Sequence, residues 1–527
     1  MPKGRFEVGE AANSSNESAS SRRGIPLAFP PLPLFAGEIN SEDRPEAQVP
    51  RALEGAMERA TRLWRGLLLR DFPIESWWQG SLLSRVSGSL RSWGKSSLLV
   101  QTSDWIGLGL VLLYWVFSAQ SSTGILGLIL LAMAALVVLG WLVETPTWLP
   151  VHLPLGLFWG IATLATILSP VPYAAREGWL KLTLYLAGYL LLQRLLRQLQ
   201  FRDWIVGSLL LVSLAMGVYG LRQYFYGAAE LATWVDPESG LAGLTRVYSY
   251  LRNPNLYGGY LIPVIPLGLA ATWIWPSWGA KLLAGFTTAV NLICLLLTYS
   301  RGAWIGGLAM LTLMAVLLAQ WHSVDLPARW RRWALPVLLS GGGAALLLGI
   351  LTVRSLRLRV QSLFWGRLDT SNNFRLNVWA AVLDMIRDFP ILGIGPGNVA
   401  FNRVYPLYQR GNFSALGAYS VPLQLTVETG FIGSLTFAWF LLVLWDHGWR
   451  CWKTLLNLRD PQGLWVAAGL AACTGMMVHG LVDTIWYRPQ VQMLWWLAVA
   501  LITASLASLS PQPPVDVGET PSETSSR

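Results

Sequence analysis

The chain has 527 residues, of which 53% are hydrophobic and 13% charged, and its mean hydropathy is +0.44. A soluble globular protein carries about 25% charged residues, so this composition excludes that class and indicates a membrane protein. The formal net charge of +10 would suit nucleic acid, but no basic soluble domain is present to bind it. We therefore expect no nucleic-acid partner and place the basic residues in loops beside a lipid bilayer.

The cysteines indicate no bound metal. Cys294, Cys451 and Cys473 lie in apolar runs or in a short basic loop, and no pair has CxxC spacing. Neither a disulfide framework nor a zinc site is indicated. We expect no metal and no cofactor.

The chain begins with two polar segments. Residues 1–50 are rich in Ser, Glu, Asn and Pro and have no apolar period, so they cannot bury enough surface to offset the entropy of ordering. No apolar run follows the first basic residues, so we expect no cleavable signal peptide. In residues 51–103, arginines alternate with Leu and Trp, which predicts an amphipathic membrane-surface segment on an anionic inner leaflet. A solvated juxtamembrane tail is the alternative.

Apolar runs of about 17 to 25 residues, the length that crosses a bilayer, follow in series. The sequence predicts an all-α polytopic membrane protein with about twelve transmembrane helices. Nine lie within residues 104–353 and three within 420–508, and a large helical loop, residues 354–419, separates the two groups. The predicted spans are 104–120, 124–143, 149–169, 178–194, 204–223, 255–275, 281–299, 303–320, 333–353, 420–445, 463–483 and 490–508.

Basic loop residues orient these helices. One side of the predicted bundle carries the basic N-terminal region together with Arg194, Arg197, Arg202, Lys281, Arg329, Arg331, Arg332, Arg450, Lys453 and Arg459. The positive-inside rule places this side in the cytoplasm, with both termini. Residues 509–527 repeat the polar composition of residues 1–50, and we interpret both segments as disordered cytoplasmic tails. The 354–419 loop then faces the periplasm of a bacterial inner membrane.

The large loop contains eight arginines and no lysine. Arginine suits a bidentate grip on phosphate or carboxylate, so we expect an anionic ligand, with attraction to lipid head groups as the alternative. Asn372-Asn373 predict the cap of a helix that ends before Pro390 and carries Arg375 in its first turn. Its expected apolar positions are Leu376, Trp379, Val382, Leu383 and Ile386.

A glycine-rich turn, residues 393–398, follows this helix. It follows a helix rather than a strand and lacks a GK[ST] ending, so a phosphate loop is not indicated. We interpret it as a turn that lets the backbone come close to another segment.

Three further groups of polar residues fall on the same predicted side. One precedes the sixth span, and Arg301 lies between the seventh and eighth. His479 and Asp483 have i,i+4 spacing near the end of the eleventh span, with Arg488 in the next turn. Such a pair is more often structural than catalytic, but an ionisable residue at the edge of a span is costly and favours a functional role. The group before the sixth span comprises Arg246, Arg252, Asn253 and Asn255.

Several stretches resemble the O-antigen ligase and polymerase superfamily, over about residues 60–508. They are residues 298–306 (TYSRGAWIG), 246–255, 375–379 with 390–397, and 423–433. Residues 418–423 (AYSVPL) and 482–489 (VDTIWYRP) more closely resemble its cyanobacterial IctB branch, which is labelled an inorganic-carbon (bicarbonate) transporter.

The resemblance implies a metal-independent glycan transferase. In the ligases, arginines hold the diphosphate of a polyprenyl-linked glycan, and a histidine in a His-Asn-x-x-Leu pattern activates the acceptor hydroxyl. The arginines match Arg301 and Arg375, but the histidine position is Tyr419, and a tyrosine with a pKa near 10 is a poor general base. Glu428 or His479 would supply the base only if the fold brings it to Tyr419.

The expected site combines these observations. Arg301, Arg375 and Tyr419 are the expected catalytic residues. The expected substrate-binding residues are Arg246, Arg252, Asn253, Asn255, Glu428, His479, Asp483 and Arg488.

Three functions remain open. The first is a ligase-type transferase that acts on a polyprenyl-diphosphate-linked glycan. The second is a bicarbonate transporter, which needs a midplane site with broken helices or buried ionisable residues, whereas the central turns of these spans are almost uncharged. The third is a non-catalytic membrane scaffold. The outward position of the arginines favours an extracytoplasmic anion site over a conduction path.

Overall fold

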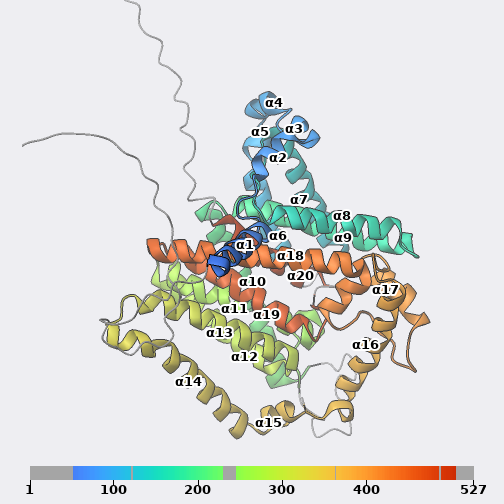
Figure 1. The fold of residues 1–527 in the computed structure, drawn as a ribbon. Coiled ribbons are helices and arrows are strands. Elements are labelled where there is room, and N and C mark those ends of the chain that lie inside the picture. Colours follow the sequence, from blue (N-terminus) through green and yellow to red (C-terminus); the bar gives the residue numbers. More distant parts are fainter. Residues whose placement is uncertain (1–50, 120–122, 229–244, 363, 486–487, 506–527) are drawn as a thin grey trace, which may run out of the picture. The chain divides into compact units, whose positions relative to one another are not determined.

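The computed structural model describes residues 51–119, 123–228, 245–362, 364–485 and 488–505, and all regular elements in these ranges are helical (Figure 1). The chain divides into two compact units, residues 1–60 and 61–527. The described residues of the first unit belong to the start of α1 (Arg51–Leu67). The predictions for the two tails lie outside the described residues. Everything below concerns the second unit.

Each predicted span coincides with a helix of the described chain, which confirms an all-α polytopic membrane protein. Eight of these helices are long and apolar enough to cross a membrane by length and composition, α6, α8 and α20 are shorter apolar helices, and α9 completes the set. The helices are α6 (Ser103–Ser118), α7 (Thr123–Val143), α8 (His152–Ile167), α9 (Pro172–Leu195), α10 (Leu199–Tyr226), α11 (Pro254–Ile274), α12 (Trp278–Leu297), α13 (Arg301–Ser323), α14 (Ala328–Thr352), α18 (Val421–Leu458), α19 (Gly463–Gly480) and α20 (Pro489–Ala504).

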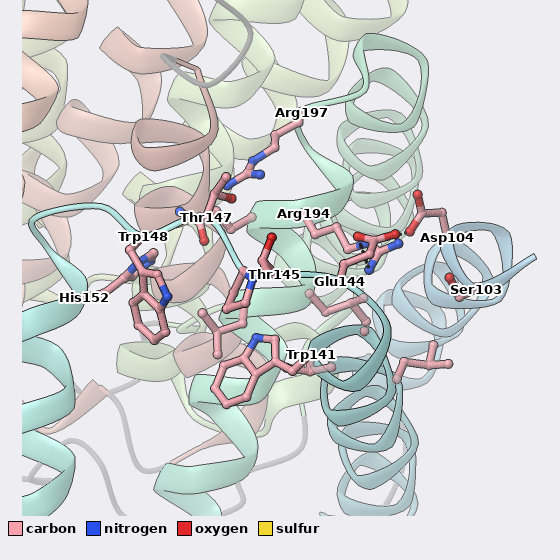
Figure 2. Close-up of a pocket in the computed structure, with 17 residues that line it drawn as sticks. Ser103, Asp104, Trp141, Glu144, Thr145, Thr147, Trp148, His152, Arg194 and Arg197 are labelled. Atoms are coloured by element: carbon pink, nitrogen blue, oxygen red, sulfur yellow. Dashed lines mark hydrogen bonds and ion pairs between the residues drawn. The ribbon is translucent and has the colours of Figure 1, made fainter. Parts of the chain in front are cut away.

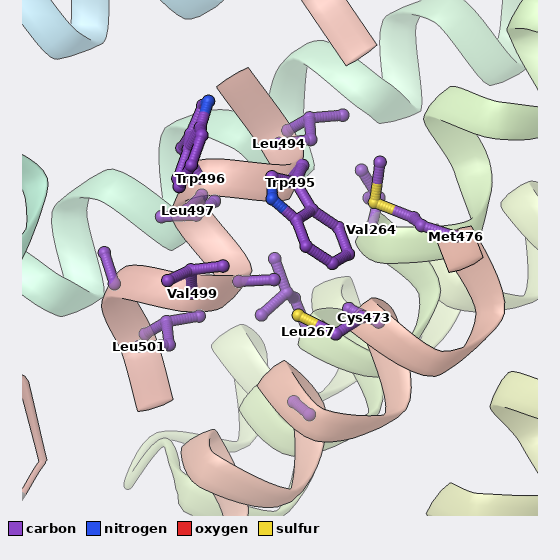
Figure 3. Packing of buried hydrophobic residues seen from close by; sticks show 14 of the residues in the cluster. Val264, Leu267, Cys473, Met476, Leu494, Trp495, Trp496, Leu497, Val499 and Leu501 are labelled. Atoms are coloured by element: carbon purple, nitrogen blue, oxygen red, sulfur yellow. The ribbon is translucent and has the colours of Figure 1, made fainter. Parts of the chain in front are cut away.

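Helices α11, α19 and α20 form the most buried part of the bundle. Figure 3 shows side chains of all three helices gathered around Trp495 of α20. Val264 and Leu267 come from α11, and Cys473 and Met476 from α19, and all are almost fully buried. The packing of this apolar centre fixes the start of α11 and the end of α19, which lie next to the polar residues of the candidate site.

Glycines let α13 and α19 pack backbone against backbone. Gly302 and Gly306 are four residues apart on α13, and a Cβ atom added at Gly306 would lie 2.5 Å from the carbonyl oxygen of Gly475 on α19. Small residues at four-residue spacing allow this close approach between membrane helices. The contact fixes Arg301, the first residue of α13, beside the end of α19.

The region between α14 and α18 has a hydrophobic core of its own. It contains α15 (Arg354–Gln361), η2 (Gly366–Leu368), α16 (Thr370–Asp388), α17 (Asn398–Val404) and η3 (Tyr405–Leu407). Val378, Val382 and Met385 of α16 pack with Phe401 and Tyr405. Helix α16 lies beside α18 (Figure 1), and α17 packs against α9.

The helix predicted in the loop is confirmed as α16, but its start and face differ from the prediction. Asp369, not Asn372-Asn373, is the N-cap, and its carboxylate accepts a hydrogen bond from the Asn372 amide at 2.8 Å. Leu383 is 51% exposed whereas Met385 is fully buried. The buried face is therefore rotated by about one residue, because it packs on the loop's own core.

Helix α18 is broken at Gly430, where φ is +65°. The break leaves the carbonyls of Val427 and Glu428 without helical donors, and the glycine-rich turn supplies them: Ile394 N donates at 2.8 Å and Gly395 N at 3.0 Å. A Cβ atom at Gly178 of α9 would overlap the Pro396 carbonyl. The prediction that this turn allows a close backbone approach is confirmed, and its neighbours are α9 and α18.

The predicted surface segment is also helical. It forms α2 (Ile74–Gly80), α3 (Leu82–Val86), α4 (Arg91–Ser96) and α5 (Leu98–Gln101). Gly88 N and Leu90 N donate to the carbonyls of Trp141 and Leu142 at 3.0 and 2.9 Å, which are among the last carbonyls of α7 and lack helical donors. The segment therefore covers the end of α7, while its location on a membrane surface stays a prediction.

Candidate functional site

Four arginines from separate parts of the chain lie within electrostatic reach of one another. We call Arg246, Arg301, Arg359 and Arg375 the arginine cluster. Each guanidinium donates to a main-chain carbonyl, which fixes its position without neutralising its charge. The donor–acceptor pairs are Arg246 with Thr298 O (3.0 Å), Arg301 with Ser362 O (2.9 Å), Arg359 with Tyr299 O (3.0 Å) and Arg375 with Val482 O (2.8 Å).

Two carboxylates accompany the cluster. Asp369 pairs with Arg301 at 2.7 Å, and Asp483 lies 3.6 Å from Arg375. Asn255 links the second pair to the rest, because its amide nitrogen donates to Asp483 at 2.8 Å and its oxygen accepts from Arg246 at 3.1 Å. Within the described chain, four guanidinium charges thus meet two carboxylates, which leaves two positive charges in excess.

The titration of these groups reflects the excess charge. Removal from water, followed by repulsion from the other three arginines, lowers the pKa of Arg246 to about 9. Burial and the charge of Arg301 lower the pKa of Arg359 to about 10. Burial alone would raise the pKa of Asp369, but the hydrogen bond and charge of Arg301 outweigh it and hold this pKa below its ordinary value of 3.8. An anion bound here would relieve repulsion among the arginines.

Three helix N-termini carry residues of this region. Asn253 caps α11, Ser300 caps α13 and Asp369 caps α16, each through its side-chain oxygen. Helix N-termini add partial positive charge and favour anions. Local sequence therefore places Arg301 and Asn255 in first turns whose dipoles reinforce the cluster. The structure gives Asn253 a capping role in this arrangement.

A cavity of about 130 Å³ is lined by residues of α8, α9, α18 and α20, the glycine-rich turn and Thr484, and we call it the Glu428 cavity. Gln424 donates to the Glu428 carboxylate at 2.6 Å and accepts from the amide of Ala418, the neighbour of Tyr419, at 2.6 Å. Thr484 lines the same cavity, is only 8% exposed, and its hydroxyl has no hydrogen-bond partner in the described chain.

Tyr419 lies beside this cavity in a left-handed backbone conformation, with φ of +50°. Its ring is half-buried and packs edge-on against Phe374, with ring centroids 5.2 Å apart. Phe374 precedes Arg375 on α16, so one helix contacts both the cluster and Tyr419.

A comparison with known families bears on this arrangement. Residues 286–438 match the O-Antigen ligase family. The matched segment runs from α12 into α18, and it contains Arg301, Arg359, Arg375, Tyr419 and Glu428. The match supports the superfamily resemblance and an integral membrane protein of O-antigen ligase type. No curated protein matches the chain.

The ligase-type residues predicted from sequence fall into separate groups. Arg246, Arg301, Arg375, Asn255 and Asp483 come together in the cluster, as the contacts above show. Glu428 lines the Glu428 cavity, and Tyr419 follows Ala418, whose amide donates to the Gln424 side chain of that cavity.

Two predicted residues, Arg252 and Arg488, lie apart from these groups. Arg252 has a left-handed backbone conformation, follows the last residue of η1 (Ser249–Leu251), and is exposed. Arg488 is exposed as the N-cap of α20.

The predicted helical pairing of His479 with Asp483 is wrong. Helix α19 ends at Gly480, so Asp483 belongs to the following turn and binds Asn255 instead. His479 is fully buried against Gly302 and Gly306, and neither ring nitrogen has a hydrogen-bond partner among the described residues.

Sequence reasoning missed Arg359, Asp369, Gln424 and Thr484 as site residues. Arg359 is one of three arginines in α15, and nothing in the sequence distinguishes it, although it is buried while Arg354 and Arg357 are exposed. Thr484 lies within the stretch that resembles the IctB branch, so a signal for it was present.

Proposed function

We propose that this membrane protein binds a polyprenyl-diphosphate-linked glycan at the arginine cluster and transfers the glycan to an acceptor hydroxyl. The observation that carries the proposal is the set of four guanidinium groups held by main-chain carbonyls, with two positive charges in excess. A diphosphate is the anion that such a set of donors fits best, because its several oxygens accept from planar forks. From the positive-inside rule we infer that the cluster faces the periplasm of a bacterial inner membrane.

The proposed reaction is a displacement at the anomeric carbon of the glycan. The acceptor oxygen forms a bond to this carbon while the bond from carbon to the diphosphate oxygen breaks. The diphosphate leaves with the electron pair, and the arginine cluster stabilises its added negative charge. Donors that are fixed before the reaction supply this stabilisation without reorganisation. The proton of the acceptor hydroxyl passes to a carboxylate.

Glu428 is the group we assign to receive that proton. Its carboxylate lines the cavity that Thr484 and Gln424 share, and Gln424 connects it to the main chain beside Tyr419. His479 packs instead against the α13 glycines, within electrostatic reach of Arg375 and Asp483. In this proposal the Glu428 carboxylate has the role of general base that a histidine has in the O-antigen ligases, although the histidine's position in the sequence is Tyr419.

The proposal is tested with the full-length protein in proteoliposomes that contain a polyprenyl-diphosphate-linked glycan. Arg375→Met removes one charge of the cluster, and Arg387→Met removes an exposed charge from the same helix. We expect Arg375→Met to lower transfer by roughly 10²–10³-fold, with Arg387→Met equal to the unaltered protein. Absence of transfer by the unaltered protein with any offered acceptor would overturn the transferase and leave a binding scaffold.

Anion transport is the second candidate, and the break in α18 is the observation that favours it. Discontinuous helices form the binding sites of many transporters, and sequence reasoning did not anticipate this break. However, the 28 residues from Phe431 to Leu458 rise about 42 Å, more than the hydrocarbon core of about 30 Å. The break therefore lies near one end of the span rather than at its centre.

The same vesicles decide between the two candidates. Bicarbonate uptake that persists in Arg375→Met, together with absent glycan transfer, would favour transport. Glycan transfer without uptake would favour the transferase.

A further inference from the structure

A second cavity, of about 250 Å³, lies among the ends of α6, α7, α8 and α9 (Figure 2). We call it the α6–α9 cavity. Its walls come from the start of α6, the end of α7, the linker to α8, and the end of α9 with Arg197 just beyond it. None of its lining residues belongs to the arginine cluster or to the Glu428 cavity.

Three hydrogen-bond donors in this cavity have no acceptor in the described chain. They are the Gln193 amide nitrogen, Arg197 Nε and Trp148 Nε1, and all three atoms are buried. The Gln193 side chain is only 3% exposed. Buried donors without acceptors are rare because the lost hydration is not replaced. Three of them around one cavity indicate a ligand that carries acceptors.

The charges divide the cavity into two sides. Arg194 is already satisfied, because it pairs with Asp104 at 2.7 Å and with Glu144 at 3.5 Å. Arg197 makes no ion pair among the described residues, and the charge of Arg194 repels it. Figure 2 shows Asp104, Glu144 and Arg194 together, with Arg197 and Trp148 away from the two carboxylates. Arg197 and Trp148, two of the three unpaired donors, therefore lie apart from the acidic side.

We propose that the α6–α9 cavity binds a phosphate-class anion, with Arg197, Gln193 and Trp148 as its donors. A phosphate offers several oxygens, so it can accept from all three groups at once, including the guanidinium fork. The volume far exceeds the roughly 30 Å³ share of one water molecule, so a phosphate ester fits where a single water would leave donors unmet.

The position of the cavity bears on the source of the phosphate. Trp141 and Trp148 line it at helix ends, where tryptophans anchor membrane proteins at the head-group level, and basic pockets at this level bind lipid phosphates. A free phosphate has the same chemistry. The proposal is independent of glycan transfer, because it concerns different residues.

The test uses the full-length protein in a maltoside detergent, which carries no phosphate. Binding of phosphatidylglycerol is measured by native mass spectrometry and binding of inorganic phosphate by calorimetry. Gln193→Leu removes one donor with little change in volume, Trp148→Phe removes the indole donor together with part of the ring, and Arg197→Met removes the charge. Arg176→Met, an exposed arginine near the other end of α9, is the matched control.

We expect each donor variant to bind about tenfold more weakly, with Arg197→Met affected most and Arg176→Met unchanged. Weakened lipid binding with no binding of inorganic phosphate identifies a lipid head group. Weakened binding of inorganic phosphate identifies a soluble anion. The proposal is overturned if neither probe binds the unaltered protein, or if folded donor variants, checked by their melting temperatures, bind as well as it does.

Discussion

Residues 482–484 contribute to two regions that are built in opposite ways. On one side, the Val482 carbonyl and the Asp483 carboxylate face the arginine cluster, in which every guanidinium has a fixed acceptor. On the other side, Thr484 borders an open cavity with a buried hydroxyl that has no partner in the described chain. In the first region the charged donors are held in place by the protein, and the second has a cavity and a buried hydroxyl without a partner among the described residues.

The proposed reaction has two corresponding halves, stabilisation of the leaving diphosphate and activation of the acceptor hydroxyl. The charge that develops on a leaving diphosphate is met by donors already in place, so the protein itself supplies this half. The attacking hydroxyl belongs to the acceptor, which must bind from solution or from the membrane. The Glu428 cavity has the volume and the polar groups to bind it. The predictions below separate these two halves.

The largest effect is expected on the open side. Glu428→Gln keeps the shape of the side chain but removes its ability to take a proton. If Glu428 is the general base, transfer falls by about 10²–10⁴-fold, while binding of the lipid-diphosphate donor, measured with a fluorescent analogue, is unchanged. Asp384→Asn, which alters an acid on α16 that pairs with Arg410 and does not line the Glu428 cavity, is the control. A Glu428→Gln protein with full activity would remove the carboxylate from the mechanism.

The second-largest effect is expected at Gly430, the residue at which α18 is broken. Gly430→Ala adds a Cβ atom that overlaps the Ile391 carbonyl at a backbone φ of +65°. We expect a loss of about 3 kcal/mol or more in stability, measured by thermal unfolding in detergent. Gly127→Ala in α7, where a Cβ atom meets nothing within 4 Å, serves as the matched control. Equal melting temperatures for both variants would contradict the break in α18.

Thr484→Val is expected to have a smaller effect, in which the KM for the acceptor rises without a loss of stability. The Thr484 hydroxyl makes no hydrogen bond in the described chain, so its replacement by a methyl group removes no internal bond and leaves stability unchanged or slightly higher. If the hydroxyl contacts the acceptor, the KM for the acceptor rises about tenfold. A loss of stability without a change in KM would show that the residue is only structural.

Much of the fold could be predicted from the sequence. The apolar runs located the spans, because length and hydropathy decide which segments cross a bilayer. The resemblance and the arginine pattern selected Arg301 and Arg375, and the polar stretch before the sixth span contributed Arg246 and Asn255. These residues proved close together in the cluster.

Other features of the fold and the site depend on tertiary contacts, which the spacing of apolar residues in the sequence does not reveal. The break at Gly430 follows from its close approach to the Pro390–Gly395 segment, whereas the local sequence is typical of a continuous helix. Leu481 and Val482 are apolar, so the eleventh span was predicted to reach 483, but its helix ends at Gly480 because the following turn serves Arg375 and Asn255. Arg359 faces inward only because α15 packs in one orientation.

The smallest effect is expected for Asp369→Asn, which separates the charge of this residue from its capping role. Asparagine caps helices as well as aspartate does, so α16 keeps its first hydrogen bond while Arg301 loses its counter-charge. At neutral pH we expect a stability loss of about 1 kcal/mol. The excess positive charge of the cluster rises, so the diphosphate donor should bind more tightly.

The pH dependence of this variant gives the sharper measurement. The pKa of Asp369 lies below its ordinary value of 3.8 in the folded protein, because the hydrogen bond and charge of Arg301 outweigh burial. The ionised carboxylate therefore stabilises the fold at all pH values above 3.8, and this contribution is lost as the pH falls through the lowered pKa. Other carboxylates titrate in both proteins, so the difference between their melting temperatures is the readout. That difference should be constant near neutrality and disappear on acidification below pH 3.8. A difference that persists in acid would mean that Asp369 acts through packing rather than through its pairing with Arg301.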